Sequence, residues 1–241
     1  IIVRGICLGV LWYFYQFKFT EINKVIHPVM YWSALLIAED FAFYWMHRID
    51  HYCRFFWAVH VTHHSSEEFN LTVGLRSSVF QPLYRFIYFI PLSFVGFNPL
   101  DVMFIYAATQ IHGILIHTKA VGKLGFLEFF LTTPSHHRVH HASNIRYLDK
   151  NMGMVFIIWD RMFGTFEEEI EGEEVLYGLT ENLKSYNPMT MIFHEWLSII
   201  EDLKKQTSIK NKLMYIFGPP GWSHDGSKKT SKQLRNQLKS K

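Results

Sequence analysis

Three short histidine clusters are the residues of this sequence best suited to chemistry. The first box has the spacing HxxxH over residues 47–51, and the second (60–64) and third (137–141) have the spacing HxxHH. Residues three or four positions apart lie on one face of a helix, so each box would present a pair of imidazoles as a chelating edge. The pattern therefore predicts metal binding. The ligands predicted from the boxes are His47, His51, His60, His63, His64, His137, His140 and His141.

The number of imidazoles predicts two metal ions. A structural zinc site uses four ligands, and eight boxed histidines exceed that number. Imidazole binds iron, zinc, copper and nickel, so the ligand type leaves the identity of the metal open. Histidines are concentrated in one part of the sequence, since 11 of the 14 lie between His47 and His141.

Several polar residues outside the boxes are further candidates. His117, at the end of an apolar run, is an additional candidate metal ligand, and His112 is a weaker one that would otherwise be a core histidine. Ligating imidazoles need a partner for their second ring nitrogen, a role for which His136 and Asp40 are candidates. The isolated histidines are expected to be ordinary hydrogen-bonded residues; they are His27, His194 and His224.

Composition excludes several other classes of protein. The 241 residues are 49% hydrophobic, with 24 Lys and Arg against 21 Asp and Glu, which requires a packed, apolar-rich body. The two cysteines, Cys7 and Cys53, can form neither a disulfide framework nor a Cys-x-x-Cys zinc module. Motifs for serine hydrolysis, nucleotide phosphates and dinucleotides do not occur, and no nucleic-acid partner is expected. Electrons for any redox reaction would therefore come from an external donor.

Four apolar runs must position the boxes. They cover residues 5–19, 26–46, 79–97 and 100–117. Helices of this length rise about 27 Å, close to the hydrocarbon thickness of a bilayer, about 30 Å. We therefore predict an all-α integral membrane protein with about four transmembrane helices in two hairpins and a cytoplasmic, His-rich di-metal cap. The alternative is a set of buried helices in a large soluble domain, which the charges of Glu39, Asp40 and Arg85 would favour.

The C-terminal part has a different character. An amphipathic helix is predicted around Met189 to Leu203, and Pro219-Pro220-Gly221 should end helical structure. Residues 202–241 carry ten Lys and Arg but only two acidic residues. We predict one domain over residues 1–222 and a basic, disordered tail over 223–241. Because the chain begins with Ile1, we also expect it to be a fragment.

The boxes resemble the signature of the fatty acid hydroxylase / sterol desaturase superfamily, which is HxxxH, HxxHH and a second HxxHH in that order. The resemblance continues outside the boxes and covers roughly residues 26–222. The flanking runs are similar to the alkylglycerol monooxygenase branch of that superfamily; they are 43–48, 62–67, 70–72, 116–118, 133–141, 149–151 and 158–166.

This resemblance implies an enzyme that uses two iron ions and O₂, with zinc as a possible replacement in purified protein. It implies an integral protein of the endoplasmic reticulum, or of the inner membrane in a bacterium. The implied substrate is a lipid with a long alkyl chain, an alkylglycerol whose ether-linked carbon is hydroxylated to release a fatty aldehyde. Tetrahydrobiopterin is implied as the external reductant. Sterol desaturation, sterol methyl oxidation and fatty acid hydroxylation remain alternatives, and a membrane zinc-binding or transport protein is the non-enzymatic one.

Overall fold

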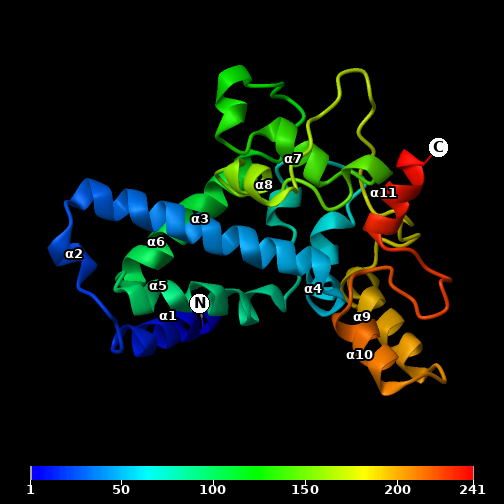
Figure 1. The fold of residues 1–241 in the computed structure, drawn as a ribbon, viewed down its shortest axis with the longest axis horizontal. Helices are drawn as coiled ribbons and strands as arrows, with labels where there is room; N and C mark the ends of the chain where they lie inside the picture. The colour runs from blue at the N-terminus through cyan, green and yellow to red at the C-terminus, as the bar shows by residue number, and fades with distance from the viewer. Residues whose placement is uncertain (1, 241) are drawn as a thin grey trace.

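The computed structural model describes residues 2–240, and the fold of these residues consists of helices joined by loops (Figure 1). The described residues contain no strand, although two isolated bridges pair Leu131 with Phe156 and Ala142 with Tyr177. The α-helices are α1 (Ile2–Tyr15), α2 (Ile22–Val25), α3 (Pro28–Tyr52), α4 (Arg54–His64), α5 (Ile90–Val95), α6 (Pro99–Leu115), α7 (Pro134–His140), α8 (Ile158–Phe163), α9 (Pro188–Lys204), α10 (Ile209–Phe217) and α11 (Ser231–Lys239). Short 3₁₀ helices are η1 (Val73–Leu75), η2 (Gln81–Leu83), η3 (Arg85–Phe89), η4 (Gly125–Phe129) and η5 (Ile145–Tyr147).

Helix α3 runs along the longest axis of the molecule, from α2 to α4 (Figure 1). It begins at Pro28 because proline fits the first helical position and because the His27 side chain accepts a hydrogen bond from the backbone N–H of Val29. Its 25 residues change character along their length. The first half buries apolar side chains such as Leu35, and the second half buries His47 and His51. One helix therefore joins an apolar body to a polar site.

The apolar body consists of α1, α5 and α6 packed on the first half of α3. Its core includes Leu11, Leu35, Phe97 and Val102, which are all buried. Residues 96–99 form a tight turn between α5 and α6. Gly96 ends α5 with a φ of 110°, a left-handed conformation that favours glycine, and α6 begins directly after the turn.

Among residues 2–240, no helix combines the length and the apolar composition that a bilayer-crossing segment needs. The prediction of four transmembrane helices in two hairpins is therefore wrong. Helix α3 is long, but it carries Glu39, Asp40, Arg48 and Asp50. The third apolar run is broken into η2, η3 and the six-residue α5, and α1 and α6 have only 14 and 17 residues.

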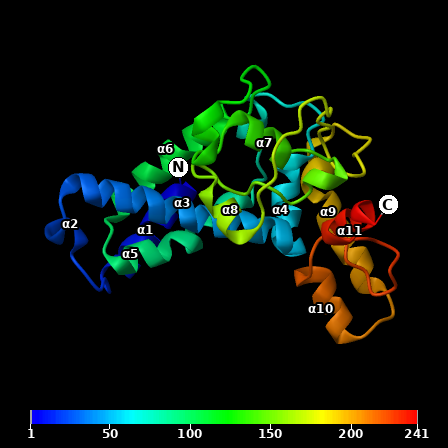
Figure 2. The same cartoon turned by 45° about the horizontal axis from the view of Figure 1, so that its top comes forward.

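The other end of the molecule is a pair of helices, α9 and α10, that lies away from α2 (Figure 2). Helix α9 confirms the predicted amphipathic helix, and α10 ends at Phe217, before the predicted proline breaker. Arg54, at the start of α4, ties the pair to the body. Its guanidinium donates to Glu195 Oε1 at 2.6 Å and to Asp202 Oδ2 at 2.7 Å. The tail predicted over 223–241 includes the helix α11, and the domain boundary at residue 222 stays a prediction.

Candidate metal centre

The structure brings nine histidines together in two adjoining groups, each with nitrogen atoms that lie within 4.8 Å of one another. Both groups combine residues from boxes that are far apart in the sequence. The first group consists of His47, His51, His60, His64 and His140, and the second consists of His63, His117, His137 and His141. These are the nine histidines that the sequence analysis predicted as ligands, and their binding of metal stays a prediction.

The first group forms where the end of α3 meets α4 and α7. His47 Nε2 lies 3.1 Å from His60 Nε2, which lies 3.1 Å from His64 Nε2. The Nε2 atoms of His51 and His140 are buried and make no hydrogen bond within residues 2–240. Five imidazoles thus direct lone-pair atoms toward one volume, and two of those atoms lack any protein partner.

The second group is centred on His117, which lies just beyond the end of α6. Its Nε2 atom lies 2.9 Å from His137 Nε2, 3.1 Å from His141 Nε2 and 3.3 Å from His63 Nε2. A close approach of η1 to α6 fixes this position. A Cβ atom on Gly74 would lie 3.1 Å from His117 Nδ1 and 2.9 Å from the backbone of Ile114, so glycine allows the contact.

Burial favours the neutral form of His117 and of seven other imidazoles in the two groups. It is the main cause of a pKa of about 4 for His117, against an ordinary value of 6.5. Burial, followed by the charges of neighbouring imidazoles, also lowers the pKa of other members well below 6.5; these are His47, His60, His63, His64, His137, His140 and His141. Metals bind the neutral form of imidazole, so the site offers ligands in the required protonation state.

Backbone carbonyls orient four of the rings through Nδ1. His47 donates to Met152 O at 2.8 Å and His140 donates to Lys150 O at 2.9 Å. In the second group, His63 Nδ1 donates to Arg76 O at 3.0 Å and His117 Nδ1 donates to Gly113 O at 2.6 Å. A proton on Nδ1 leaves the lone pair on Nε2, and the hydrogen bond from Nδ1 to a backbone carbonyl fixes both the tautomer and the orientation of the ring.

Residues 149–152, which we call the carbonyl loop, supply two of these acceptors. Asp149 and Asn151 have φ angles of 53° and 55°, which only a few residue types adopt readily. The Asn151 amide donates to His136 O at 3.1 Å and to Glu167 O at 2.8 Å, and its oxygen accepts from Glu167 N at 2.9 Å. Asn151 thus holds a strained loop against α7. The sequence analysis did not predict this role, because every residue has a backbone carbonyl and the residue type does not show which carbonyl accepts a hydrogen bond.

Two buried carboxylates hold the segment that follows the carbonyl loop. Asp160 accepts from Met152 N and Gly153 N, both at 2.7 Å. Asp40 accepts from Val155 N at 2.7 Å and from Phe156 N at 3.0 Å. The suggested contact between Asp40 and a ligating imidazole is therefore wrong, since its partners are backbone groups and the Trp159 side chain. Asp40 acts on His47 only through the segment that contains the acceptor of His47 Nδ1.

A buried polar network lies behind His60. Its Nδ1 atom lies 3.3 Å from the side-chain amide of Gln81 and 3.9 Å from Asp50 Oδ2. Asp50 accepts from Tyr84 Oη at 2.8 Å, and Arg85 lies 3.9 Å from the same carboxylate. When the Gln81 amide is oriented so that its oxygen accepts from Arg85, the same oxygen faces His60 Nδ1. His60 then also presents its lone pair at Nε2.

The remaining histidines lie outside both groups. His112 is half-buried, and its Nε2 atom lies 3.2 Å from Thr132 O, outside both groups. His136 Nδ1 lies 3.2 Å from Leu131 O and takes part in the capping of α7, and none of its hydrogen bonds reaches a grouped imidazole. The isolated histidines bond locally as expected, His27 to Val29 N, His194 to Thr190 O and His224 to Tyr215 Oη.

The donor set and its surroundings fit metal ions. Nine buried or half-buried nitrogen ligands, with the Nδ1 protons of four of them already committed, are suited to two transition-metal ions. Phe69 covers the second group, with its ring centroid 5.3 Å from that of His141 and 5.6 Å from that of His117. Tyr177 stacks on Phe69 at 4.8 Å and extends the apolar cover.

The molecule is a helical protein with two adjoining groups of buried histidines suited to metal ions. Comparison with known proteins identifies the family to which it belongs. The fatty acid hydroxylase family matches residues 32–165, and the chain belongs to this family. Human alkylglycerol monooxygenase is 42% identical over 192 residues, which cover 79% of this chain and 42% of the human protein. The chain thus spans less than half the length of this relative.

More distant relatives act on other lipids, according to their names. Ornithine lipid hydroxylase OlsE of Rhizobium tropici is 30% identical over 60% of this chain and 44% of its own length. A Delta(7)-sterol 5(6)-desaturase of Gibberella zeae is 29% identical over 56% of this chain and 43% of its own length. No solved structure matches the chain.

Proposed function

We propose that the chain contains the metal centre of an O₂-dependent lipid monooxygenase that uses two iron ions. The observation that carries the proposal is the convergence of nine imidazoles in two adjoining groups. The proposed ligands are the members of those groups, His47, His51, His60, His64 and His140 for one ion and His63, His117, His137 and His141 for the other. Imidazole ligation also suits zinc, so zinc could occupy the site in purified protein.

The proposed reaction is cleavage of an alkylglycerol ether, supported by the 42% identity to human alkylglycerol monooxygenase. Two iron ions would supply the O₂ activation needed to attack a C–H bond beside the ether oxygen. The reaction consumes O₂, two electrons and two protons. One oxygen atom becomes a hydroxyl group on the ether-linked carbon, and the other leaves as water. The resulting hemiacetal breaks its C–O bond to the glycerol and yields a fatty aldehyde.

The protein itself contributes to this chemistry by positioning the imidazole rings and by excluding water from the histidine groups. The carbonyl acceptors hold the imidazole rings in one tautomer, so no reorganisation is needed when the reaction begins. Phe69 and Tyr177 shield one side of the second group, and burial keeps competing protons from the ligands. A dry, fixed ligand cage limits loss of the oxidising equivalent to water.

An apolar cavity supports a substrate with a long alkyl chain. It has a volume of about 450 Å³ and lies against α4, the helix that carries the second box; its lining is Phe55, Val59, Phe80, Leu83, Tyr84, Phe193 and Trp196. Val59 directly precedes His60, so the cavity and the first histidine group lie close along one helix. We propose that this cavity holds the alkyl chain of the substrate.

We propose tetrahydrobiopterin as the external reductant, which is what the resemblance to alkylglycerol monooxygenases implies. Because the proposed substrate is a membrane lipid, the proposed location is the endoplasmic-reticulum membrane of a eukaryotic cell or the inner membrane of a bacterium. The more distant sterol and ornithine-lipid relatives favour a related oxidation of another lipid as the second candidate.

The test is an assay of cells that express the chain, supplied in parallel with a 1-alkylglycerol, a sterol and a fatty acid. Each substrate is tested with tetrahydrobiopterin and with a reduced cytochrome system. We expect O₂-dependent fatty aldehyde from the ether lipid alone, and only with the pterin. A modified sterol or a hydroxylated fatty acid would assign the chain to the second candidate, and no oxidised product from any lipid would contradict both.

A further inference from the structure

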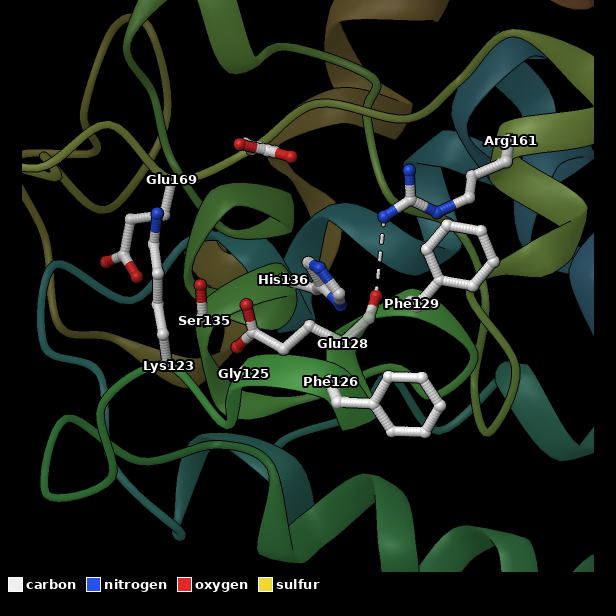
Figure 3. Close-up of a pocket in the computed structure, with 10 residues that line it drawn as sticks. Lys123, Gly125, Phe126, Glu128, Phe129, Ser135, His136, Arg161 and Glu169 are labelled. Atoms are coloured by element: carbon white, nitrogen blue, oxygen red, sulfur yellow. Dashed lines mark hydrogen bonds between the residues drawn. The ribbon is translucent and has the colours of Figure 1, made fainter.

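A second cavity lies beside the third histidine box, and none of its lining residues belongs to the two histidine groups (Figure 3). It has a volume of about 370 Å³ and is lined by residues from η4, α7 and α8 and from the segment after α8. Ser135 and His136 line it and directly precede His137, a member of the second group. Anything bound in this cavity would therefore be separated from the proposed metal centre by little more than α7.

One side of the cavity is a fixed hydrogen-bonding edge. Glu128 Oε1 accepts from Leu124 N at 3.0 Å and from Thr133 Oγ1 at 2.9 Å, which holds the carboxylate in place and leaves Oε2 without a hydrogen bond in residues 2–240. Ser135 Oγ is buried, with 1% of the residue exposed, and has no hydrogen-bond partner among the described residues. Figure 3 shows the Glu128 carboxylate and the Ser135 hydroxyl on the same side of the cavity. A buried hydroxyl without a partner is costly unless a ligand completes it.

The other side of the cavity is aromatic. Phe126 and Phe129 line it, and 79% and 58% of these residues are exposed. The Arg161 guanidinium lies 5.2 Å from the ring of Phe129 and 3.7 Å from the ring of Phe166. Exposed rings beside a cation form a platform on which a flat, electron-rich heterocycle can stack.

These two sides together select a class of ligand. The free Oε2 atom of Glu128 can accept a hydrogen bond from an N–H group of a ligand, such as one on the edge of an aminopyrimidine ring. Three carboxylates and two cations line the cavity, a balance that disfavours a phosphate-bearing nucleotide; they are Glu128, Glu168, Glu169, Lys123 and Arg161. The volume suits a bicyclic ring with a short side chain, and a protein electron donor would need an open surface instead.

We propose that this cavity is the binding site of the reduced pterin, with Glu128 bonding the aminopyrimidine edge, Ser135 completing a further hydrogen bond and Phe129 stacking on the ring. The assignment rests on the proposed use of a pterin as reductant. It places the electron donor on the far side of α7 from His137, so the pterin and the lipid would occupy separate cavities.

Binding tests this proposal without any need for turnover. The purified full chain is titrated calorimetrically with 7,8-dihydrobiopterin, which is not a reductant for the metal centre. Glu128→Gln keeps the acceptor for Leu124 N but removes the charge, and we expect pterin affinity to fall at least about tenfold, the usual cost of losing a charged hydrogen bond. Phe129→Leu, at an exposed position, should also weaken binding, and Glu171→Gln, a matched change at an exposed position outside the cavity, should not.

The outcomes separate this inference from the proposed function. Pterin binding that is lost in Glu128→Gln while the ether lipid is not cleaved would uphold the binding site and overturn the proposed reaction. Ether cleavage by a chain that does not bind the pterin would overturn the binding site and uphold the proposed reaction. Equal affinity of the wild type, Glu128→Gln and Phe129→Leu would overturn the site, and circular dichroism and metal content verify that each variant is folded.

Discussion

His117 and His137 bring their Nε2 atoms to within 2.9 Å of one another, although only His137 belongs to a histidine box. The pair joins the end of α6 to α7 and makes His117 the centre of the second group. The boxes alone would have supplied only three of that group's four members.

His117 and His112 form a matched pair for testing this relationship. We expect His117→Ala to lower metal content from two ions per chain to about one, because it removes the central ligand of the second group. His112→Ala, which removes only a contact to Thr132 O, should keep both ions. Equal metal content in the two variants, measured by elemental analysis, would rule out His117 as a ligand.

The carbonyl loop gives a second prediction. Asn151→Ala removes three hydrogen bonds and places alanine at a φ of 55°, which costs about 1 kcal/mol, so we expect metal affinity to fall by about 10- to 100-fold. Asn151→Gly relieves the backbone strain but not the lost hydrogen bonds, and its affinity should lie between that of the wild type and that of Asn151→Ala. Chelator competition measures all three. Wild-type affinity in Asn151→Ala would show that the loop does not orient the ligands.

The histidine spacing allowed eight of the nine members of the two groups to be predicted, because residues at helical intervals can be read directly from the sequence. The ninth, His117, was a candidate because it lies at the end of an apolar run. The membrane hairpins were not predictable in the same way. The prediction of membrane hairpins used the length and mean apolarity of whole runs. Within those runs, the buried acids Glu39, Asp40 and Asp50 make one half of α3 polar. Pro82 and Pro91 lie in the third run, which forms only short helices. The carbonyl acceptors of Lys150 and Met152 could not be predicted from the sequence, because every residue has a carbonyl group.

Glu39 should impose a pH dependence on stability. Burial, and then the neighbouring charge of Asp40, raises the pKa of Glu39 well above its ordinary value of 4.5. The folded chain therefore retains a proton that the unfolded chain has lost, and the free energy of unfolding should fall as pH rises above about 4.5. Glu39→Gln cannot ionise, so its free energy of unfolding should fall less between pH 5 and pH 8. Parallel urea-unfolding profiles for the two proteins over this range would contradict the assignment.

The boxed histidines should be essential for turnover. We expect His47→Ala, His63→Ala and His140→Ala each to abolish lipid oxidation while the chain stays folded, because each change removes a proposed ligand. His224→Ala is the control, since its imidazole bonds Tyr215 Oη at 2.7 Å and lies in neither group. Near-normal turnover in the His63 variant would remove the second box from the proposed ligand set.

The most direct test of the account is the ratio of metal to protein in the chain produced in iron-supplemented medium. Two groups of four and five converging imidazoles predict two metal ions per chain, iron in the active protein, and loss of lipid oxidation when a chelator removes them. One ion per chain, or oxidation that persists after both ions are removed, would contradict the central claim.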